Sequence, residues 1–150
     1  MAHVYPVITL YQPWATWIIR GWKTIETRTH NRFQSLNGKH ILIHAGKQTD
    51  GLASTNPYLS AAQILHNPKE MKNGFIIGGA FVHDFRALDD SHSKDALIDC
   101  GSVQRFGLFL NQIYPLTDPI EVRGEMGIWY FDWGAKQKVK KSVDKSYSLF

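Results

Sequence analysis

Cysteine is nearly absent from this chain: Cys100 is the only one among 150 residues. A single cysteine forms no disulfide within the chain and no thiolate metal site of the Cys-x-x-Cys kind, so we expect an inert small side chain. Long apolar runs are also missing: no stretch approaches the ~20 residues that span a bilayer, and the first residues lack the basic and apolar regions of a secretory signal. These absences predict a cytoplasmic domain that does not contact a membrane.

The motifs that identify several enzyme classes are missing as well. The sequence contains no GxGxxG or GxxxxGK[ST] phosphate loop, no HExxH zinc motif and no GxSxG nucleophile elbow. Its seven histidines are scattered, and only His40 and His44 lie four residues apart. In a strand this spacing puts both on one face, but too far apart to hold one metal without a third ligand. We therefore expect neither a metal nor another cofactor.

Apolar residues are plentiful, whereas charge is low. Apolar residues make up 43% of the chain, aromatic residues 13% and charged residues 20%, which is typical of a folded globular domain rather than a disordered chain. A length of 150 residues favours a single domain with a substantial core. The formal net charge of +4 permits an anionic partner. Part of it lies in a predicted basic, solvated tail over residues 134–150, which contains Lys136, Lys138, Lys140, Lys141 and Lys145.

Hydrophobic patterns and turn residues predict a chain of strands with two helices. Extended segments are predicted at residues 4–11, 23–30, 40–45, 74–88, 106–116 and 121–131, and helices at residues 13–21 and 58–66. Residues 89–103 are predicted to form a polar loop, and a turn around Asp118-Pro119 joins the last two strands. The pair Gly78-Gly79 predicts a bulge or the close approach of another backbone.

These elements do not alternate strand and helix in the regular manner of a doubly wound parallel sheet. The predicted fold class is therefore α+β, with a small, mostly antiparallel β-barrel of about five to six strands and two or so appended helices.

The densest cluster of chemically versatile residues surrounds the first predicted helix. Residues 12–14 (QPW) precede the helix, and residues 21–28 (GWKTIETR) follow it. Lys23 and Arg28 on a common polar surface can hold phosphate oxygens, and Glu26 can orient them or accept a hydrogen bond from a base. The alternative is a surface ion-pair network, because alternating Lys, Glu and Arg residues are common on exposed strands.

The tryptophans have two interpretations. Trp14 and Trp22 at the helix ends can stack on a base, an interaction worth roughly 1–3 kcal/mol per base, although core packing is the simpler role for each. Trp17 and Trp129 are expected in the core.

Several of these segments resemble the ASCH domain family of the PUA-like superfamily. The segments are Ile8–Ala15 (ITLYQPWA), Gly21–Arg28 (GWKTIETR), His44–Lys47 (HAGK), Gly78–Ala80 (GGA), Val122–Gly124 (VRG) and Gly127–Trp129 (GIW). The spacing from QPWA to GxKxxExR is the spacing of the family. The resemblance covers residues 5–133, which favours a folded ASCH domain over residues 1–133.

The resemblance implies a PUA-like β-barrel with a cleft beside the first helix. Relatives in this superfamily bind RNA or DNA, which makes single-stranded RNA or a modified nucleotide the expected ligand. The family's cleft residues correspond here to Gln12, Pro13, Trp14, Lys23, Glu26 and Arg28, with Lys47 and Arg123 as further candidates. Such a site combines cations for the backbone, polar groups for base edges and an aromatic wall for stacking.

Some ASCH relatives are similar in fold but catalytic, including an amidohydrolase that deacetylates N4-acetylcytidine and others with ribonuclease activity. The amidohydrolase uses a lysine, a threonine three residues later and a distant glutamate. In this chain the lysine is Lys23, but the third residue after it is Glu26 and the nearby threonine is Thr24. The catalytic set therefore does not transfer residue by residue. A desolvated Lys23 can act as a general base, although an adjacent carboxylate favours its charged form.

Three functions remain open at this stage. The first is a non-catalytic nucleic-acid-binding domain. The second is a hydrolase of a nucleoside or RNA, with Lys23, Glu26 and Thr24 as catalytic candidates. The third is a protein-interaction module whose cleft binds no nucleic acid.

Overall fold

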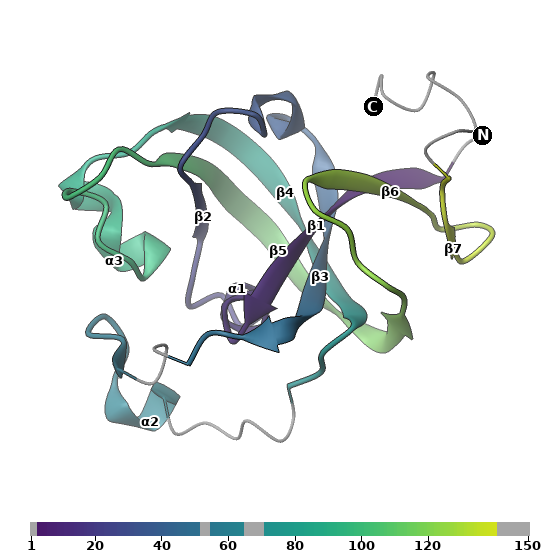
Figure 1. The fold of residues 1–150 in the computed structure, drawn as a ribbon, viewed down its shortest axis with the longest axis horizontal. Coiled ribbons are helices and arrows are strands. Elements are labelled where there is room, and N and C mark those ends of the chain that lie inside the picture. Colours follow the sequence, from purple (N-terminus) through teal and green to yellow (C-terminus); the bar gives the residue numbers. More distant parts are fainter. Residues whose placement is uncertain (1–2, 52–54, 65–70, 141–150) are drawn as a thin grey trace.

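The structure, a computed structural model, describes residues 3–51, 55–64 and 71–140 of the chain. The described strands are β1 (Val4–Gln12), β2 (Ile25–Arg28), β3 (His40–Thr49), β4 (Phe75–Ala87), β5 (Phe106–Glu121), β6 (Ile128–Asp132) and β7 (Gln137–Lys138), as labelled in Figure 1. The described helices are α1 (Trp14–Ile19), α2 (Ala61–Ile64) and α3 (Ser93–Ala96), with the 3-10 helices η1 (Gln34–Leu36) and η4 (Asp90–His92). None of the helices in these described ranges is long and apolar enough to cross a membrane.

The strands form one mixed sheet in the order β2-β5-β4-β3-β1-β6-β7. β1 and β3 are parallel and are joined by a crossover that contains α1 and β2, and the other neighbouring strands are antiparallel. The predicted α+β class is confirmed. The predicted closed barrel of five to six strands is wrong, since the described sheet has seven strands and is open, with β2 and β7 at its edges.

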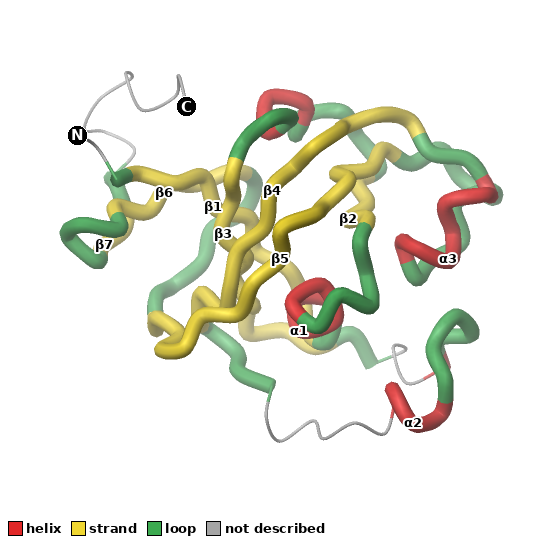
Figure 2. Tube along the Cα trace, turned by 180° about the vertical axis from the view of Figure 1, so that it is seen from behind, coloured by secondary structure: helices red, strands yellow, loops and turns green. Residues whose placement is uncertain are grey.

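Helix α1 lies against the concave side of this sheet. It packs against β1, β3, β4 and β5, and Figures 1 and 2 show the sheet curving around it. Ala15 and Ile18 of α1 are fully buried in the main core cluster, together with Ile8 of β1 and Ile43 of β3. Because the helix covers the concave face, the core is closed from water without any pairing between the two sheet edges.

The C-terminal end of α1 turns the chain sharply toward β2. Gly21 has a positive φ of 78°, a conformation that glycine adopts without strain. The backbone N–H groups of Trp22 and Lys23 both donate to the carbonyl of Trp17, at 3.0 and 3.1 Å. This turn directs the Lys23 side chain back into the protein.

The bulge predicted at Gly78-Gly79 is confirmed. The pairing of β4 with β5 shifts register between Ile76 and Gly78 and again between Gly79 and Phe81. A side chain at Gly78 would collide with the carbonyl oxygen of Tyr114 and with the side chain of Ile19. The glycines thus allow β5 and α1 to approach β4 closely.

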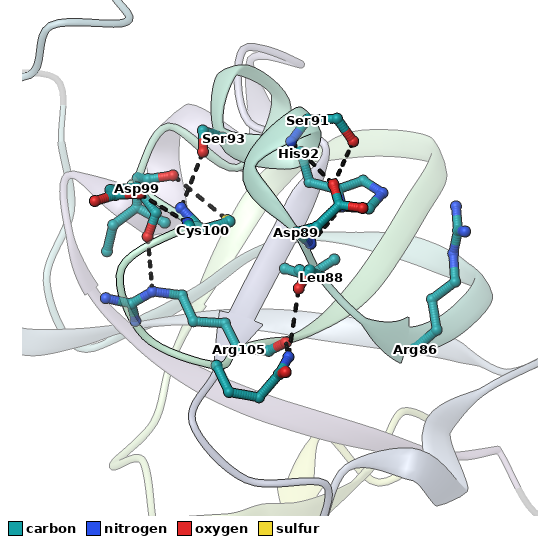
Figure 3. Close-up of polar contacts among 12 residues, drawn as sticks. Arg86, Leu88, Asp89, Ser91, His92, Ser93, Asp99, Cys100 and Arg105 are labelled. Carbon is teal, nitrogen blue, oxygen red and sulfur yellow. Dashed lines mark hydrogen bonds and ion pairs between the residues drawn. The ribbon is translucent and has the colours of Figure 1, made fainter.

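The region predicted as a polar loop, residues 89–103, instead contains η4 and α3. Asp89 starts η4: its Oδ1 accepts a hydrogen bond from the N–H of Ser91 at 2.9 Å, and its own N–H donates to Nδ1 of His92 at 3.0 Å (Figure 3). Ser93 Oγ accepts from the N–H of Cys100 at 2.9 Å and closes the region on itself. The loop prediction was wrong because both helices are too short to show an apolar period. The Asp89 cap stabilises η4, and the burial of Ala96 against Ile25 and Leu88 stabilises α3.

The turn predicted around Asp118-Pro119 is also absent. β5 continues through this point to Glu121, and residues 122–127 make the connection to β6. β2 pairs only with Phe106–Phe109 of β5, so the later part of β5 has β4 alone as its neighbour. Asp118 and Pro119 lie in a register shift between the Pro115–Gly78 and Ile120–Ile76 pairs, where the ladder has no partner for them, so proline is tolerated there.

Two further predictions fall partly outside the described residues. The helix predicted at residues 58–66 corresponds to α2, and residues 65–66 lie outside the description. Of the predicted basic tail, residues 134–140 include β7, which pairs with β6, and residues 141–150 lie outside the description.

Candidate functional site

A cleft of about 880 Å³ opens between β1, β2, β3 and the connection before β6. Its volume lies in the range of sites that hold small ligands. The described residues that line it with charge are the cations Lys23, Arg28, Arg32, Lys47 and Arg123 and the carboxylates of Glu26, Asp50 and Glu125. Arg32, Lys47 and Arg123 are exposed, whereas Lys23 and Glu26 are buried.

Lys23, Glu26 and Arg28 form a continuous ion-pair network at the cleft. Lys23 Nζ donates to the carbonyl of Ala96 at 2.5 Å and lies 3.7 Å from Glu26 Oε1. Arg28 Nη2 lies 3.1 Å from Glu26 Oε2. Only 2% of the Lys23 side chain and 8% of the Glu26 side chain are exposed, so the network is buried rather than superficial.

Burial controls the protonation of Lys23. Loss of hydration lowers the pKa of Lys23, and the nearby Glu26 carboxylate opposes this effect without cancelling it. Of the two opposing effects expected on the pKa of Lys23, desolvation is therefore larger than the effect of the adjacent carboxylate. A buried lysine with a lowered pKa is the type of group that can exchange a proton.

Trp14 forms an aromatic wall of the cleft. Its Nε1 donates to Asp50 Oδ2 at 3.0 Å, and Lys23 Nζ lies 5.1 Å from its ring centre. Trp17 and Trp129 are buried, which confirms their predicted core positions. Trp22 is not among the residues that line the cleft, and packs beside the buried Trp17 cluster.

His44 of β3 is a buried residue of the cleft lining. Its Nε2 lies 2.7 Å from the carbonyl oxygen of Val122, and its ring meets Trp129 edge-on with ring centres 5.4 Å apart. Burial is the main cause that lowers the pKa of His44, and the Lys138 charge acts in the same direction. His40, by contrast, is exposed at the start of β3, ahead of the buried stretch Ile41–Gly46.

The cleft brings together six of the residues predicted for it, namely Trp14, Lys23, Glu26, Arg28, Lys47 and Arg123. Gln12, Pro13 and Thr24 are not among its lining residues. Gln12 is buried, with Oε1 accepting from the N–H of Thr16 at 3.0 Å and Nε2 donating to the carbonyl of Lys72 at 2.9 Å. It positions α1 against the chain before β4.

Sequence reasoning missed several lining residues, including Thr9, Tyr11, Thr27, His30, Arg32, His44, Asp50, Glu125 and Met126. The alternation of β1 is a signal for Thr9 and Tyr11, which lie two residues apart and so share a strand face. No group of three or more His, Cys, Asp or Glu residues that could hold a metal occurs within the described ranges.

Comparisons with known proteins give a consistent family and fold. The family model described as ASCH domain matches residues 8–130. The crystal structure of ASCH from Zymomonas mobilis is similar with a TM-score of 0.50 and 18% identity, covering 78% of this chain and 73% of that one. The crystal structure of a point mutant of the same Zymomonas mobilis protein gives a TM-score of 0.48 and 18% identity, covering 78% and 75%. No curated protein matches the sequence.

The family match spans most of the chain and includes the Trp14, Lys23, Glu26 and Arg28 positions of the cleft. The structural similarity supports the same fold at low sequence identity. The chain therefore belongs to the ASCH domain family.

Proposed function

We propose that this ASCH domain binds single-stranded RNA or a modified nucleotide in the cleft. The observation that carries the proposal is the combination, in one cleft of about 880 Å³, of the Trp14 ring, a buried polar network and exposed cations. Stacking surfaces and cations that follow the backbone are the two components of single-strand binding. The association of the ASCH family with nucleic-acid binding supports the same conclusion.

The residues divide by depth. Lys47 and Arg123 are exposed cations at the cleft and are assigned to phosphate or sugar oxygens. Arg28 and Glu26 are assigned to polar contacts with the base, since the paired guanidinium and carboxylate groups are less exposed than Lys47 and Arg123. Lys23 already bonds Ala96 and Glu26, so in the binding proposal it positions Glu26 rather than a phosphate. Gln12 is likewise assigned to positioning α1.

The test is fluorescence anisotropy of a short labelled RNA with the full chain and with Lys47→Glu and Arg123→Glu variants. Lys23→Glu is a poor choice, because it would place two carboxylates together in a buried position. We expect the double variant to bind at least about tenfold more weakly, equivalent to about 1.4 kcal/mol. Lys94→Glu is the matched control, since Lys94 is exposed on α3 and does not line the cleft. Unchanged affinity in the double variant would refute binding in the cleft.

A second candidate function is hydrolysis of a nucleoside or RNA, and the burial of Lys23 favours it. The lowered pKa of Lys23 suits a general base, and the cleft gives a ligand access to the Lys23–Glu26 pair. Thr24 does not line the cleft, so Lys23 and Glu26 carry this proposal alone. Incubation with N4-acetylcytidine and with RNA, across a range of pH, tests it. Turnover that Lys23→Met abolishes would support a hydrolase, and intact substrates would exclude it.

A further inference from the structure

Two large apolar side chains are strongly exposed where they line the cleft. Tyr11 of β1 is 53% exposed, and Met126 in the connection before β6 is 94% exposed. Scattered apolar side chains on a surface need no explanation, whereas two that line one cleft favour contact with a ligand. The Tyr11 side chain has no hydrogen-bond partner and no ring contact among the described residues, and it belongs to none of the apolar core clusters. Its ring is therefore open to a ligand.

The pairing of β1 with β3 places Tyr11 beside an exposed cation. Leu10 pairs with Ala45 and Gln12 pairs with Thr49, so the register shifts at Tyr11 and three residues of β3, 46–48, lie opposite it. The middle one of these is Lys47, which is exposed and also lines the cleft. An aromatic ring and an ammonium group thus come to the cleft from neighbouring positions on adjacent strands.

Trp14 gives the cleft a second aromatic surface close to Tyr11. Three peptide units separate the two residues, which limits the distance between their Cα atoms to about 11 Å. Trp14 is partly exposed, and its Nε1 donates to Asp50 Oδ2 at 3.0 Å. The N–H of Asp50 in turn donates to the carbonyl of Gln12 at 2.7 Å, so the carboxylate is attached to the end of β1. These bonds hold the indole ring in place beside Tyr11.

We propose that Tyr11 and Trp14 stack consecutive bases of a single strand, so that the cleft takes at least two nucleotides rather than one. Lys47 lies beside Tyr11, where it can neutralise a phosphate group of the same strand. Aromatic side chains that stack successive bases, combined with cations along the backbone, are the usual means of binding a single strand. This inference rests on the proposed nucleic-acid binding in the cleft, and between the two ligands of that proposal it favours single-stranded RNA over an isolated nucleotide.

Binding of adenosine 5′-monophosphate and of the dinucleotide pApA, which carries one further nucleotide, tests this inference. By titration calorimetry of the full chain, we expect pApA to bind at least about tenfold more tightly, because a second base is stacked. Tyr11→Ala should weaken pApA binding by about tenfold and leave the affinity for adenosine 5′-monophosphate unchanged, since that base lies on Trp14. Tyr11→Phe keeps the ring and should retain the wild-type affinity for both ligands.

Tyr114→Ala is the matched control. Tyr114 is a tyrosine of β5 that is 42% exposed and does not line the cleft, so its removal should leave both affinities unchanged. Two analogues of pApA, each lacking one base, separate stacking from charge because they keep both phosphate groups. Both analogues should bind the wild-type protein more weakly than pApA, and an analogue that binds as tightly as pApA would overturn the inference.

The outcomes separate this inference from the proposed function. Equal affinities for adenosine 5′-monophosphate and pApA, or an equal loss for both ligands in Tyr11→Ala, would overturn stacking of consecutive bases and leave nucleotide binding standing. A protein that binds neither of these ligands nor RNA would overturn both.

Discussion

Lys23 places an ammonium group in the protein interior, where it meets the Ala96 carbonyl and the Glu26 carboxylate. Glu26 also pairs with Arg28 and thus holds two cations at once. A buried charge is costly when it loses its counter-charge, whereas a well-packed apolar replacement of the whole pair is often neutral. The stability of this part of the cleft therefore depends on Glu26.

The Glu26→Gln variant tests that dependence. We expect it to lower the free energy of unfolding by about 3–5 kcal/mol, because Lys23 would then be buried without an anion. Adding Lys23→Met to Glu26→Gln should recover much of the loss, since methionine fills a similar volume without charge. Urea denaturation measures the free energy of unfolding of the single and the double variant. If the loss of unfolding free energy in the double variant equalled the sum of the losses in the two single variants, Lys23 and Glu26 would not be coupled.

His44 makes stability depend on pH. Its folded pKa is lowered below the ordinary 6.5, mainly by burial, so the unfolded chain binds a proton more readily than the folded protein. The free energy of unfolding therefore falls as the pH drops from 7 through 6.5 toward the lowered folded pKa. The charged groups nearby are Lys138, which acts in the same direction, and Glu125, which pairs with Lys138.

Urea denaturation of His44→Gln at about pH 7 and about pH 5.5, on either side of the ordinary histidine pKa, checks this linkage. The variant should lose less stability between the two pH values than the wild-type protein. His30→Gln is the comparison, because the pKa of His30 is also lowered but His30 is far less buried. An identical pH dependence in His44→Gln and the wild-type protein would contradict the assignment.

The spacing of Lys23, Glu26 and Arg28 in the sequence predicts that the three side chains lie together, and the ion pairs join all three. Their burial could not be predicted from the spacing. Lys23 is buried because Ala96 of α3, 73 residues later, supplies the carbonyl that it bonds. Nothing local to residues 21–28 encodes that contact. His44 was overlooked for a similar reason, since its partner Val122 lies 78 residues away.

At the scale of elements, local pattern located β1, α1, β3 and β4 well, because each contains a recognisable set of buried apolar residues, periodic in α1 and continuous in β3 and β4. It failed where an element is stabilised by something other than that period. η4 depends on the Asp89 cap, α3 on the burial of Ala96, and the end of β5 on pairing with β4 alone. The turn residues Asp118 and Pro119 mark a shift in the pairing of β5 with β4 rather than the end of β5.

The close approach of α1 and β5 to β4 can be tested at Gly78. Gly78→Ala should lower the free energy of unfolding by about 1–3 kcal/mol, because the new methyl group would collide with the Tyr114 carbonyl and the Ile19 side chain. Gly51→Ala is the control, since a Cβ there meets nothing within 4 Å, and we expect a change within about 0.5 kcal/mol. Thermal or urea unfolding distinguishes them. Equal stability of the two variants would mean that β4 can move away from α1 at little cost.

At the scale of the whole molecule, the α+β class followed from composition and element order, whereas the openness of the sheet did not. Whether a curved sheet closes depends on the pairing of its edge strands, here β2 and β7, and not on alternation within any strand. β7 has only two residues, which leaves almost no periodic pattern to detect. The covering of the concave face by α1 likewise depends on tertiary packing.

The charge distribution of the whole molecule predicts how RNA binding depends on salt. The net charge is +4. Lys23 and Arg28 are both paired with Glu26, so we expect the exposed cations of the cleft to make the phosphate contacts. Each phosphate neutralised on a single strand contributes about −0.7 to the slope of log affinity against log salt.

The Lys47→Gln and Arg123→Gln double variant of the full chain should therefore reduce the magnitude of this slope by about 1.4. The difference is insensitive to the lysines after residue 140, because both proteins contain them. Anisotropy titrations at several salt concentrations measure the slope, and Lys94→Gln should leave it unchanged. A double variant whose slope equals that of the wild-type protein would place the phosphates outside the cleft. The cleft would then be left to a neutral ligand, because a nucleoside without phosphate needs neither cation.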